Sequence, residues 1–458
     1  MKKIIREFFV VFILLSMMPN NVRAENGKTN VSSATGPLTM ADAIKIAITN
    51  NPELKASVFS ERAAQSSLGQ ARAGFLPVIN FTETFKRTNT PMWVFGNLLN
   101  QGKITKNDFN PSILNDPDAI NNFTSLLSIS MPVYSGGRIY NSFKKAELNS
   151  RIAGLMHKQT EQGIIAKTSL AYTGLLLAKK NFEVILQSLK SANASLRLVQ
   201  SRYSNGFSVK SDLLRAKVRI ADLEQQRLSA NNRIEIAKSY LNAAMGLPVD
   251  TPVNVDAYFK KSSEPEGYLI DFIRKAVKNR PELQILRLKK EIAVKGIKIA
   301  ESAHLPSINI FANYENNSED LSNGQNDYSL GAAMHINLFS GFGINSKINS
   351  AKLSLNRIRE IHKSMETGIK IQTRQAWLDL KTAWKRIHVA DSALEQAVEN
   401  LRIIRNRYEN GLLTIVSLLD AELADQRARA NHFNAVYDYE SARIKLALAS
   451  GTLNADFK

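Results

Sequence analysis

The chain has 458 residues, of which 60 are basic and 41 acidic, and it carries a formal net charge of +19 and no cysteine. The lack of cysteine excludes disulfides, thiolate metal sites and a cysteine nucleophile. A charge of this size suits nucleic acid, an anionic membrane surface or an anionic cargo. The lysines and arginines are spread along predicted helices, however, so we attribute most of the charge to solvated helix surface.

The N-terminal segment has the features of a secretory signal peptide. A basic start precedes an almost wholly apolar run over residues 8–18, and residues 22–24 (Val-Arg-Ala) fit a small-residue cleavage site. We predict a signal peptide over residues 1–24; a retained membrane anchor is the alternative, but the run is short for a bilayer span. No later stretch reaches 18 consecutive apolar residues. An exported chain rarely meets nucleic acid, so no nucleic-acid partner is predicted.

A helix and two strands come next. The helix begins near Thr39, breaks near Pro52 and continues to about Ala73. Apolar and polar residues then alternate over residues 78–86 and 127–133. Alternation of this kind is typical of a membrane-spanning strand with one lipid face and one wet face, although half-buried strands of other proteins share it.

A long helical hairpin follows the strands. Residues 138–203 contain no proline, so they predict one helix about 100 Å long. A turn at Gly206 leads to a return helix from Leu213. Apolar residues in the distal half of the long helix step by three and four, which is coiled-coil spacing. They are Phe182, Ile185, Leu189, Ala192, Leu196, Val199 and Tyr203. We therefore predict an antiparallel hairpin.

The second half of the chain repeats the first. Residues 51–54 (Asn-Pro-Glu-Leu) return 229 positions later as Arg-Pro-Glu-Leu, and residues 202–206 (Arg-Tyr-Ser-Asn-Gly) return 205 positions later as Arg-Tyr-Glu-Asn-Gly. The offsets differ by 24 residues, and this length change falls between the first two strands. The corresponding elements are a helix over 270–302, strands over 307–314 and 328–338, and a long helix over 343–408. We predict repeats over 25–246 and 269–458, joined by a linker over 247–268.

Four strands do not close a membrane barrel. Closed bacterial barrels have eight or more strands, and lipid does not tolerate open strand edges. Several chains must therefore contribute: two would supply eight strands, and three would supply twelve and leave a lumen. The fold class predicted is mainly α with β, in which a duplicated helix–strand–strand–long helical hairpin unit builds a barrel continued by a helical tube.

The ordered motifs resemble a known family. Each half has a Leu-Pro-led strand, a Ser-Gly turn into the long helix, and Arg-Tyr-x-x-Gly at the hairpin tip. This set, present twice over residues 38–453, resembles the TolC-type outer-membrane factor family. The resemblance implies a homotrimer with a twelve-stranded transmembrane β-barrel and a twelve-helix periplasmic α-barrel. It also implies the exit duct of a tripartite efflux pump or type I secretion system, in the outer membrane and extending into the periplasm. The implied partners are outer-membrane lipid, a periplasmic adaptor (membrane fusion protein) and an inner-membrane pump or ABC transporter.

The resemblance also places the periplasmic entrance at the hairpin tips, around Gly206 and Gly411. Each glycine suits a helix C-cap with positive φ. We expect their apolar neighbours to be exposed and to dock onto the adaptor. The predicted docking residues are Gly206, Gly411, Phe207, Val209, Leu412 and Leu413.

Two acids lie just past the tips. Threefold symmetry would turn Asp212 and Asp420 into carboxylate rings that select cations; alternatively, each is a first-turn acid that complements the helix dipole. Ser417 stands where some family members carry a second Asp, so a single ring is expected at that level. Leu413 replaces an arginine that ties the closed entrance in some members, so that ionic lock cannot form here. The predicted entrance residues are Asp420, Asp212, Ser417, Ser211 and Tyr408.

No catalytic chemistry is predicted. The six histidines lack metal-ligand spacing, and no phosphate-binding glycine motif or marked carboxylate pair occurs. We predict no enzyme activity, cofactor or metal. The alternative to a duct is a non-conducting periplasmic coiled-coil adaptor or scaffold, which would not need the four alternating strands.

Overall fold

The computed structural model describes residues 37–255, 258–259, 263–321 and 324–454. The predicted signal peptide lies outside these residues. The unit described below begins at Leu38. None of the helices in the described ranges combines the length and the apolar character that a membrane span requires.

The helix that opens the first half is divided in two, as predicted. Helix α2 (Met40–Asn50) starts at Thr39, whose hydroxyl accepts a backbone hydrogen bond from the first turn at 3.2 Å. Asn51 then adopts an extended backbone, and its Oδ1 accepts a hydrogen bond from the Glu53 amide at 2.9 Å. Helix α3 (Pro52–Ala73) begins directly with proline, which has no amide hydrogen to leave unpaired at that position.

The second half has the same division. Helix α8 (Leu269–Asn279) ends at Arg280, whose backbone is extended, and helix α9 (Pro281–Glu301) again begins with proline. A short 3-10 turn, η2 (Ser302–His304), leads into the strands.

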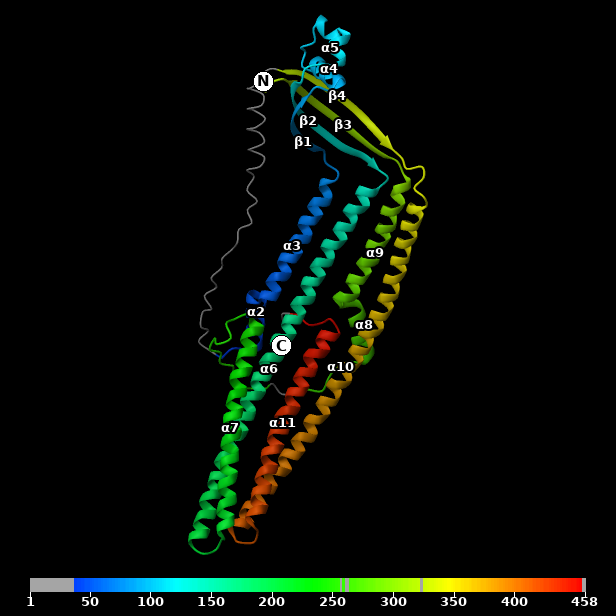
Figure 1. Ribbon diagram of the computed structural model, residues 1–458. Coiled ribbons are helices and arrows are strands. Elements are labelled where there is room, and N and C mark those ends of the chain that lie inside the picture. The colour runs from blue at the N-terminus through cyan, green and yellow to red at the C-terminus, as the bar shows by residue number, and fades with distance from the viewer. Residues whose placement is uncertain (1–36, 256–257, 260–262, 322–323, 455–458) are drawn as a thin grey trace. The chain divides into compact units, whose positions relative to one another are not determined.

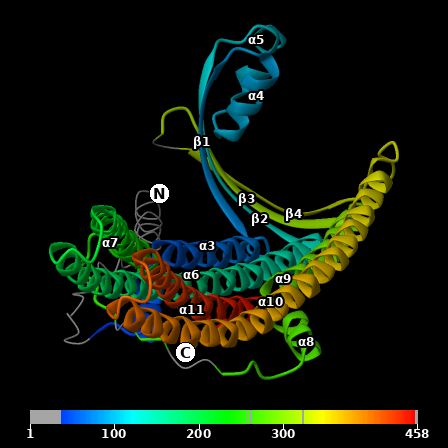
Figure 2. The ribbon, with the colours of Figure 1, turned by 90° about the horizontal axis from the view of Figure 1, so that it is seen from below.

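Four strands form one antiparallel sheet in the order β1-β2-β3-β4. Their bounds are β1 Val78–Thr88, β2 Ile120–Ser135, β3 Ser307–Ser318 and β4 Gly324–His335. All four predicted strands are present, but the prediction that the last one reaches residue 338 is wrong. His335 pairs with Ser307, the first residue of β3, so residues beyond His335 have no ladder partner. Figure 2 shows that the sheet is curved.

The connection between β1 and β2 is a folded insertion. It contains α4 (Pro91–Asn100), η1 (Lys106–Phe109) and α5 (Pro111–Asn115), which lie beyond one end of the strands (Figure 1). The Gln101 side-chain amide ties it to β2 by donating to the Asn121 carbonyl at 2.8 Å and to Asn122 Oδ1 at 2.7 Å. The length difference between the two halves therefore corresponds to structure added at a single connection.

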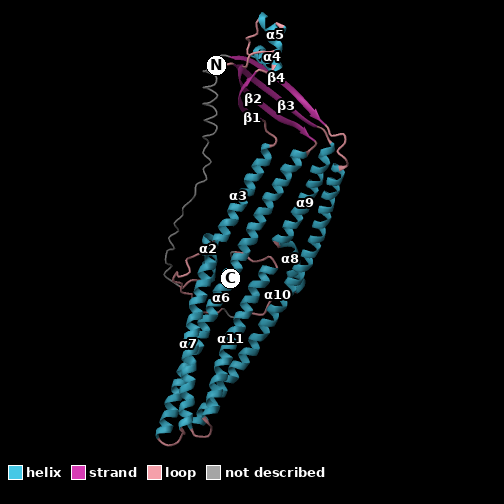
Figure 3. Cartoon of the chain, viewed as in Figure 1, coloured by secondary structure: helices cyan, strands magenta, loops and turns pink. Residues whose placement is uncertain are grey.

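Two hairpins contain most of the helical residues (Figure 3). The first is α6 (Arg138–Ser204) with α7 (Lys210–Met245), and the second is α10 (Gly343–Glu409) with α11 (Ile415–Ala449). Both long helices have 67 residues. Helix α11 packs against α6 and so joins the hairpins, while α3 and α9 pack against the part of α6 nearer the sheet. The predicted heptad stripe is buried at Leu189, Ala192 and Val199.

Candidate channel entrance

The tips of the hairpins have matching turns. Gly206 has φ +77° and Gly411 has φ +78°, so the predicted left-handed conformation is confirmed at both. In each turn the amide after the glycine donates to the carbonyl of the tip arginine, at 2.8 Å in the first hairpin and 2.9 Å in the second. These bonds satisfy carbonyls that the helix end would otherwise leave free.

An arginine of the first hairpin holds the tip of the second. Arg202 Nη1 donates to the Tyr408 carbonyl at 2.5 Å, and its guanidinium carbon lies 5.2 Å from the centre of the Tyr408 ring. Tyr408 is only 4% exposed. Burial raises the pKa of the Tyr408 phenol, with the Arg202 cation acting in the opposite direction. Arg202 was not among the predicted entrance residues, although the repeated Arg-Tyr pair is visible in the sequence.

The two acids past the tips occupy different positions. Asp212 lies in the first turn of α7 and accepts a hydrogen bond from the Ser208 hydroxyl at 2.9 Å. Asp420 is exposed and lies beyond the first turn of α11, which contains no acid. The helix-dipole interpretation therefore remains open for Asp212 and is wrong for Asp420.

The remaining predicted residues divide by exposure. Phe207, Val209 and Leu412 are 76%, 62% and 71% exposed, as expected of a docking surface. Leu413 is half-buried, so the expectation that it is exposed is wrong. Ser211 is exposed, while Ser417 donates its amide to the Thr414 hydroxyl at 3.4 Å in the N-cap of α11. Ser417 therefore lies in the first turn of α11, where Thr414 caps its backbone amide.

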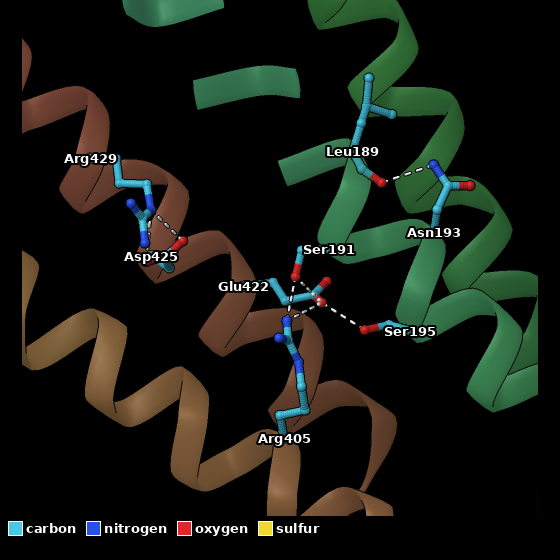
Figure 4. A network of polar contacts seen from close by, with 8 residues as sticks. All are labelled: Leu189, Ser191, Asn193, Ser195, Arg405, Glu422, Asp425 and Arg429. Carbon is cyan, nitrogen blue, oxygen red and sulfur yellow. Dashed lines mark hydrogen bonds and ion pairs between the residues drawn. The ribbon is translucent and has the colours of Figure 1, made fainter. Parts of the chain in front are cut away.

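A buried acid joins three helices above the tips (Figure 4). Glu422 on α11 is 5% exposed, and its Oε1 accepts hydrogen bonds from the hydroxyls of Ser195 (2.7 Å) and Ser191 (3.0 Å) on α6. Arg405 on α10 lies 3.5 Å from the same carboxylate and also donates to Ser191. This network links the two hairpins, and nothing in the spacing of the sequence marks it. Among the described residues, no group of three or more histidine or acidic side chains is arranged to hold a metal ion.

The combination of long helical hairpins with a four-stranded antiparallel sheet is a fold also found in solved structures of outer-membrane channels. The structure of VceC from Vibrio cholerae aligns with 90% of this chain and 96% of its own, with a TM-score of 0.76 and 19% identity. The CmeC channel of Campylobacter jejuni aligns with 92% of this chain and 87% of its own, with a TM-score of 0.77 and 17% identity. These likenesses establish the fold.

The sequence establishes the family. The family model described as outer membrane efflux protein matches residues 43–247 and 272–452, and the chain belongs to this family. The TolC protein of Vibrio cholerae serotype O1 is 23% identical over 445 residues, covering 96% of each chain. The alkaline protease secretion protein AprF of Pseudomonas aeruginosa is 20% identical over 428 residues, covering 91% of this chain and 85% of the relative.

The duct interpretation is thereby confirmed over the scaffold alternative. The protein is an outer-membrane exit duct of the kind that serves efflux and type I secretion, and it is not an enzyme.

Proposed function

We propose that three copies of the chain assemble into the duct. The observation that supports this most is the sheet, whose outer strands β1 and β4 each have one unpaired edge within the chain. Large apolar side chains on these strands are exposed in the single chain, among them Phe81 (68%), Tyr328 (80%) and Leu330 (74%). Because lipid does not tolerate unpaired edges, β1 of one copy pairs with β4 of the next. Three sheets of four strands form a twelve-stranded barrel.

The helical hairpins continue the barrel into the periplasm as a twelve-helix tube. In this assembly residues 25–246 and 269–458 are the two structural repeats, and residues 247–268 form the equatorial linker between them. The assembly is tested by the mass of the detergent-solubilised protein in analytical ultracentrifugation. Three copies are expected, and a single copy at all concentrations would contradict the proposal.

The duct works with other proteins at its periplasmic end. The exposed apolar tip residues Phe207, Val209 and Leu412 offer a surface for a periplasmic adaptor, which connects the duct to an inner-membrane pump or ABC transporter. The names of the relatives include both protease secretion and pyoverdine export, so both protein and small-molecule cargo occur among them. Gly206 and Gly411 shape this surface by closing the two turns.

The entrance is lined at its narrowest level by Asp420. In a threefold assembly the exposed Asp420 side chains form one ring of carboxylates, with Ser417, Ser211 and Asp212 around it. The predicted entrance residue Tyr408 is buried, so its part is the tip contact with Arg202 and not the lining of the entrance. We expect Asp420→Ala to raise the concentration of a multivalent cation that half-blocks the channel by about tenfold, because three negative charges are lost at one level. The measurement is block of single-channel current in a planar bilayer.

Asp271→Ala provides the matched control. Asp271 is also on a helix and pairs with Arg274 at 3.2 Å, but it lies in α8, far along the chain from either tip. Its removal is expected to leave the block unchanged. If Asp420→Ala behaves like Asp271→Ala, Asp420 lies off the ion pathway.

A further inference from the structure

The surfaces that form the contact between the two hairpins have counterparts on α7 and α10, and these counterparts are more exposed in the single chain. Within the chain, α11 packs against α6. Because the two halves of the chain are duplicates, α10 is the counterpart of α6, and α7 is the counterpart of α11. In an assembly of several copies, the contact that follows α10 along the layer would be made with the α7 of another copy. Helices α7 and α10 lie at opposite edges of the helical layer (Figure 1). The equivalent contact therefore joins α10 of one copy to α7 of the next.

Residues at the contact between α6 and α11 are buried, and their counterparts on α10 and α7 are more exposed, as expected if a second copy covers those counterparts. On α6, Ser195 is 4% exposed and Val199 is fully buried, whereas their counterparts on α10, 205 positions later, are exposed (Asn400) or half-buried (Ile404). The same holds at the start of the return helices. Ile415 and Leu418 on α11 are buried, whereas their counterparts on α7 are exposed (Lys210) or half-buried (Leu213). A surface that is covered in one repeat is open in the other.

The residue types of the tip contact occur in both halves of the chain, but the contact forms only once within the described residues. Arg202 holds Tyr408 within the chain. The counterparts are Arg407 and Tyr203, and both residue types are kept. Tyr203 is 40% exposed, against 4% for Tyr408, and within the described residues the Arg407 guanidinium has no hydrogen bond or ion pair. One chain thus presents a donor at the tip of one hairpin and its acceptor at the tip of the other.

We propose that Arg407 of one copy clasps Tyr203 of the next copy. Arg407 donates to the Tyr203 carbonyl and covers its ring, as Arg202 does with Tyr408. This inference rests on the proposed trimer. Around the entrance, three clasps between copies then alternate with three clasps within copies.

Hydrogen-bonding groups farther from the tip are also complementary. Within the chain the acceptor Glu422 faces the donors Ser191 and Ser195. At the corresponding places, α7 carries the donor Lys217, and α10 carries Gln396 and Asn400, whose amide oxygens accept. The return helix thus carries a donor where its counterpart carries an acceptor, and the long helix carries acceptors where its counterpart carries donors. The counterpart contact therefore remains complementary. The second copy of this chain is therefore a chemically suitable occupant.

Cross-linking tests the clasp, because the natural chain has no cysteine. The double variant Tyr203→Cys/Arg407→Cys, assembled in membranes and treated with a short bifunctional thiol reagent, is expected to give covalent dimers and trimers on a denaturing gel. The matched variant Arg202→Cys/Tyr408→Cys is expected to be linked within one chain, and it shows whether the reagent spans this geometry. Each single variant controls for linkage between like positions.

The possible results separate the clasp from the trimer. If the internal pair is linked, the wild-type protein sediments as three copies and Tyr203→Cys/Arg407→Cys stays monomeric on the gel, the clasp is wrong and the trimer stands. If the wild-type protein sediments as one copy, the trimer itself is wrong. Should the tip variant fail to assemble, Lys217→Cys/Asn400→Cys tests the same interface. It is expected to give the same ladder, and its absence overturns the inference.

Discussion

Replacing Gly246 by alanine is expected to lower the free energy of unfolding by about 3 kcal/mol. Gly246 ends α7 with φ +73°, which an L side chain adopts only with strain. A Cβ placed there would lie 2.6 Å from the Asn51 Cα and 2.7 Å from the Asn50 carbonyl group. Both neighbours are backbone atoms at the break between α2 and α3, so neither can rotate away. The measurement is urea unfolding of the solubilised protein, followed by far-UV circular dichroism.

Gly174→Ala is the control for this prediction. Gly174 lies inside α6, and a Cβ there would meet nothing within 4 Å. Alanine favours a helix interior over glycine by up to about 1 kcal/mol, so this variant is expected to be as stable as the wild type or more so. Equal stability of the Gly246 and Gly174 variants would show that the end of α7 does not pack closely against Asn51.

Arg405→Met is expected to cost about 2 kcal/mol of stability at the junction of the hairpins. The substitution leaves the buried Glu422 carboxylate without its cation, while the two serine hydroxyls remain. This expected loss of stability allows for solvent screening of Arg405, because its side chain is 37% exposed. Urea unfolding provides the measurement. Arg405→Met/Glu422→Met, which removes both charges, is expected to recover most of the loss.

The control for the charge is Arg402→Met. Arg402 is on the same helix and pairs with Glu399 at 2.7 Å, but both side chains are more than half exposed. Exposed pairs of this kind contribute little, so a change within about 0.5 kcal/mol is expected. If Arg402→Met and Arg405→Met cost the same, burial of Glu422 does not depend on its cation.

Local signals explain why most helices and strands were predictable. The breaks at Asn51 and Arg280 each precede a proline, which disfavours helical backbone at the residue before it and suits the first position of the next helix. The long helices combine a proline-free run with three-four spacing of apolar residues in their distal halves. The turn glycines need positive φ, which few other residues adopt. Each of these signals depends on a few neighbouring residues only.

The features that were missed depend on residues far apart in the chain. The end of β4 is determined by Ser307, the last partner available on β3. The Glu422 network brings together helices more than 200 positions apart. Spacing along the sequence carries none of this information, whereas the duplication does indicate which residues occupy equivalent places.

Single-channel recording tests the central claim, a conducting trimeric duct, most directly. The purified protein, shown by sedimentation to contain three copies, is inserted into a planar lipid bilayer, and the current is measured under both polarities. The same measurement is made on Arg202→Ala, which removes the contact between Arg202 and Tyr408 at the hairpin tips and is expected to let the entrance widen. Discrete conductance steps are expected, larger or more frequent in the variant. A stable trimer that carries no current in either protein would contradict the account.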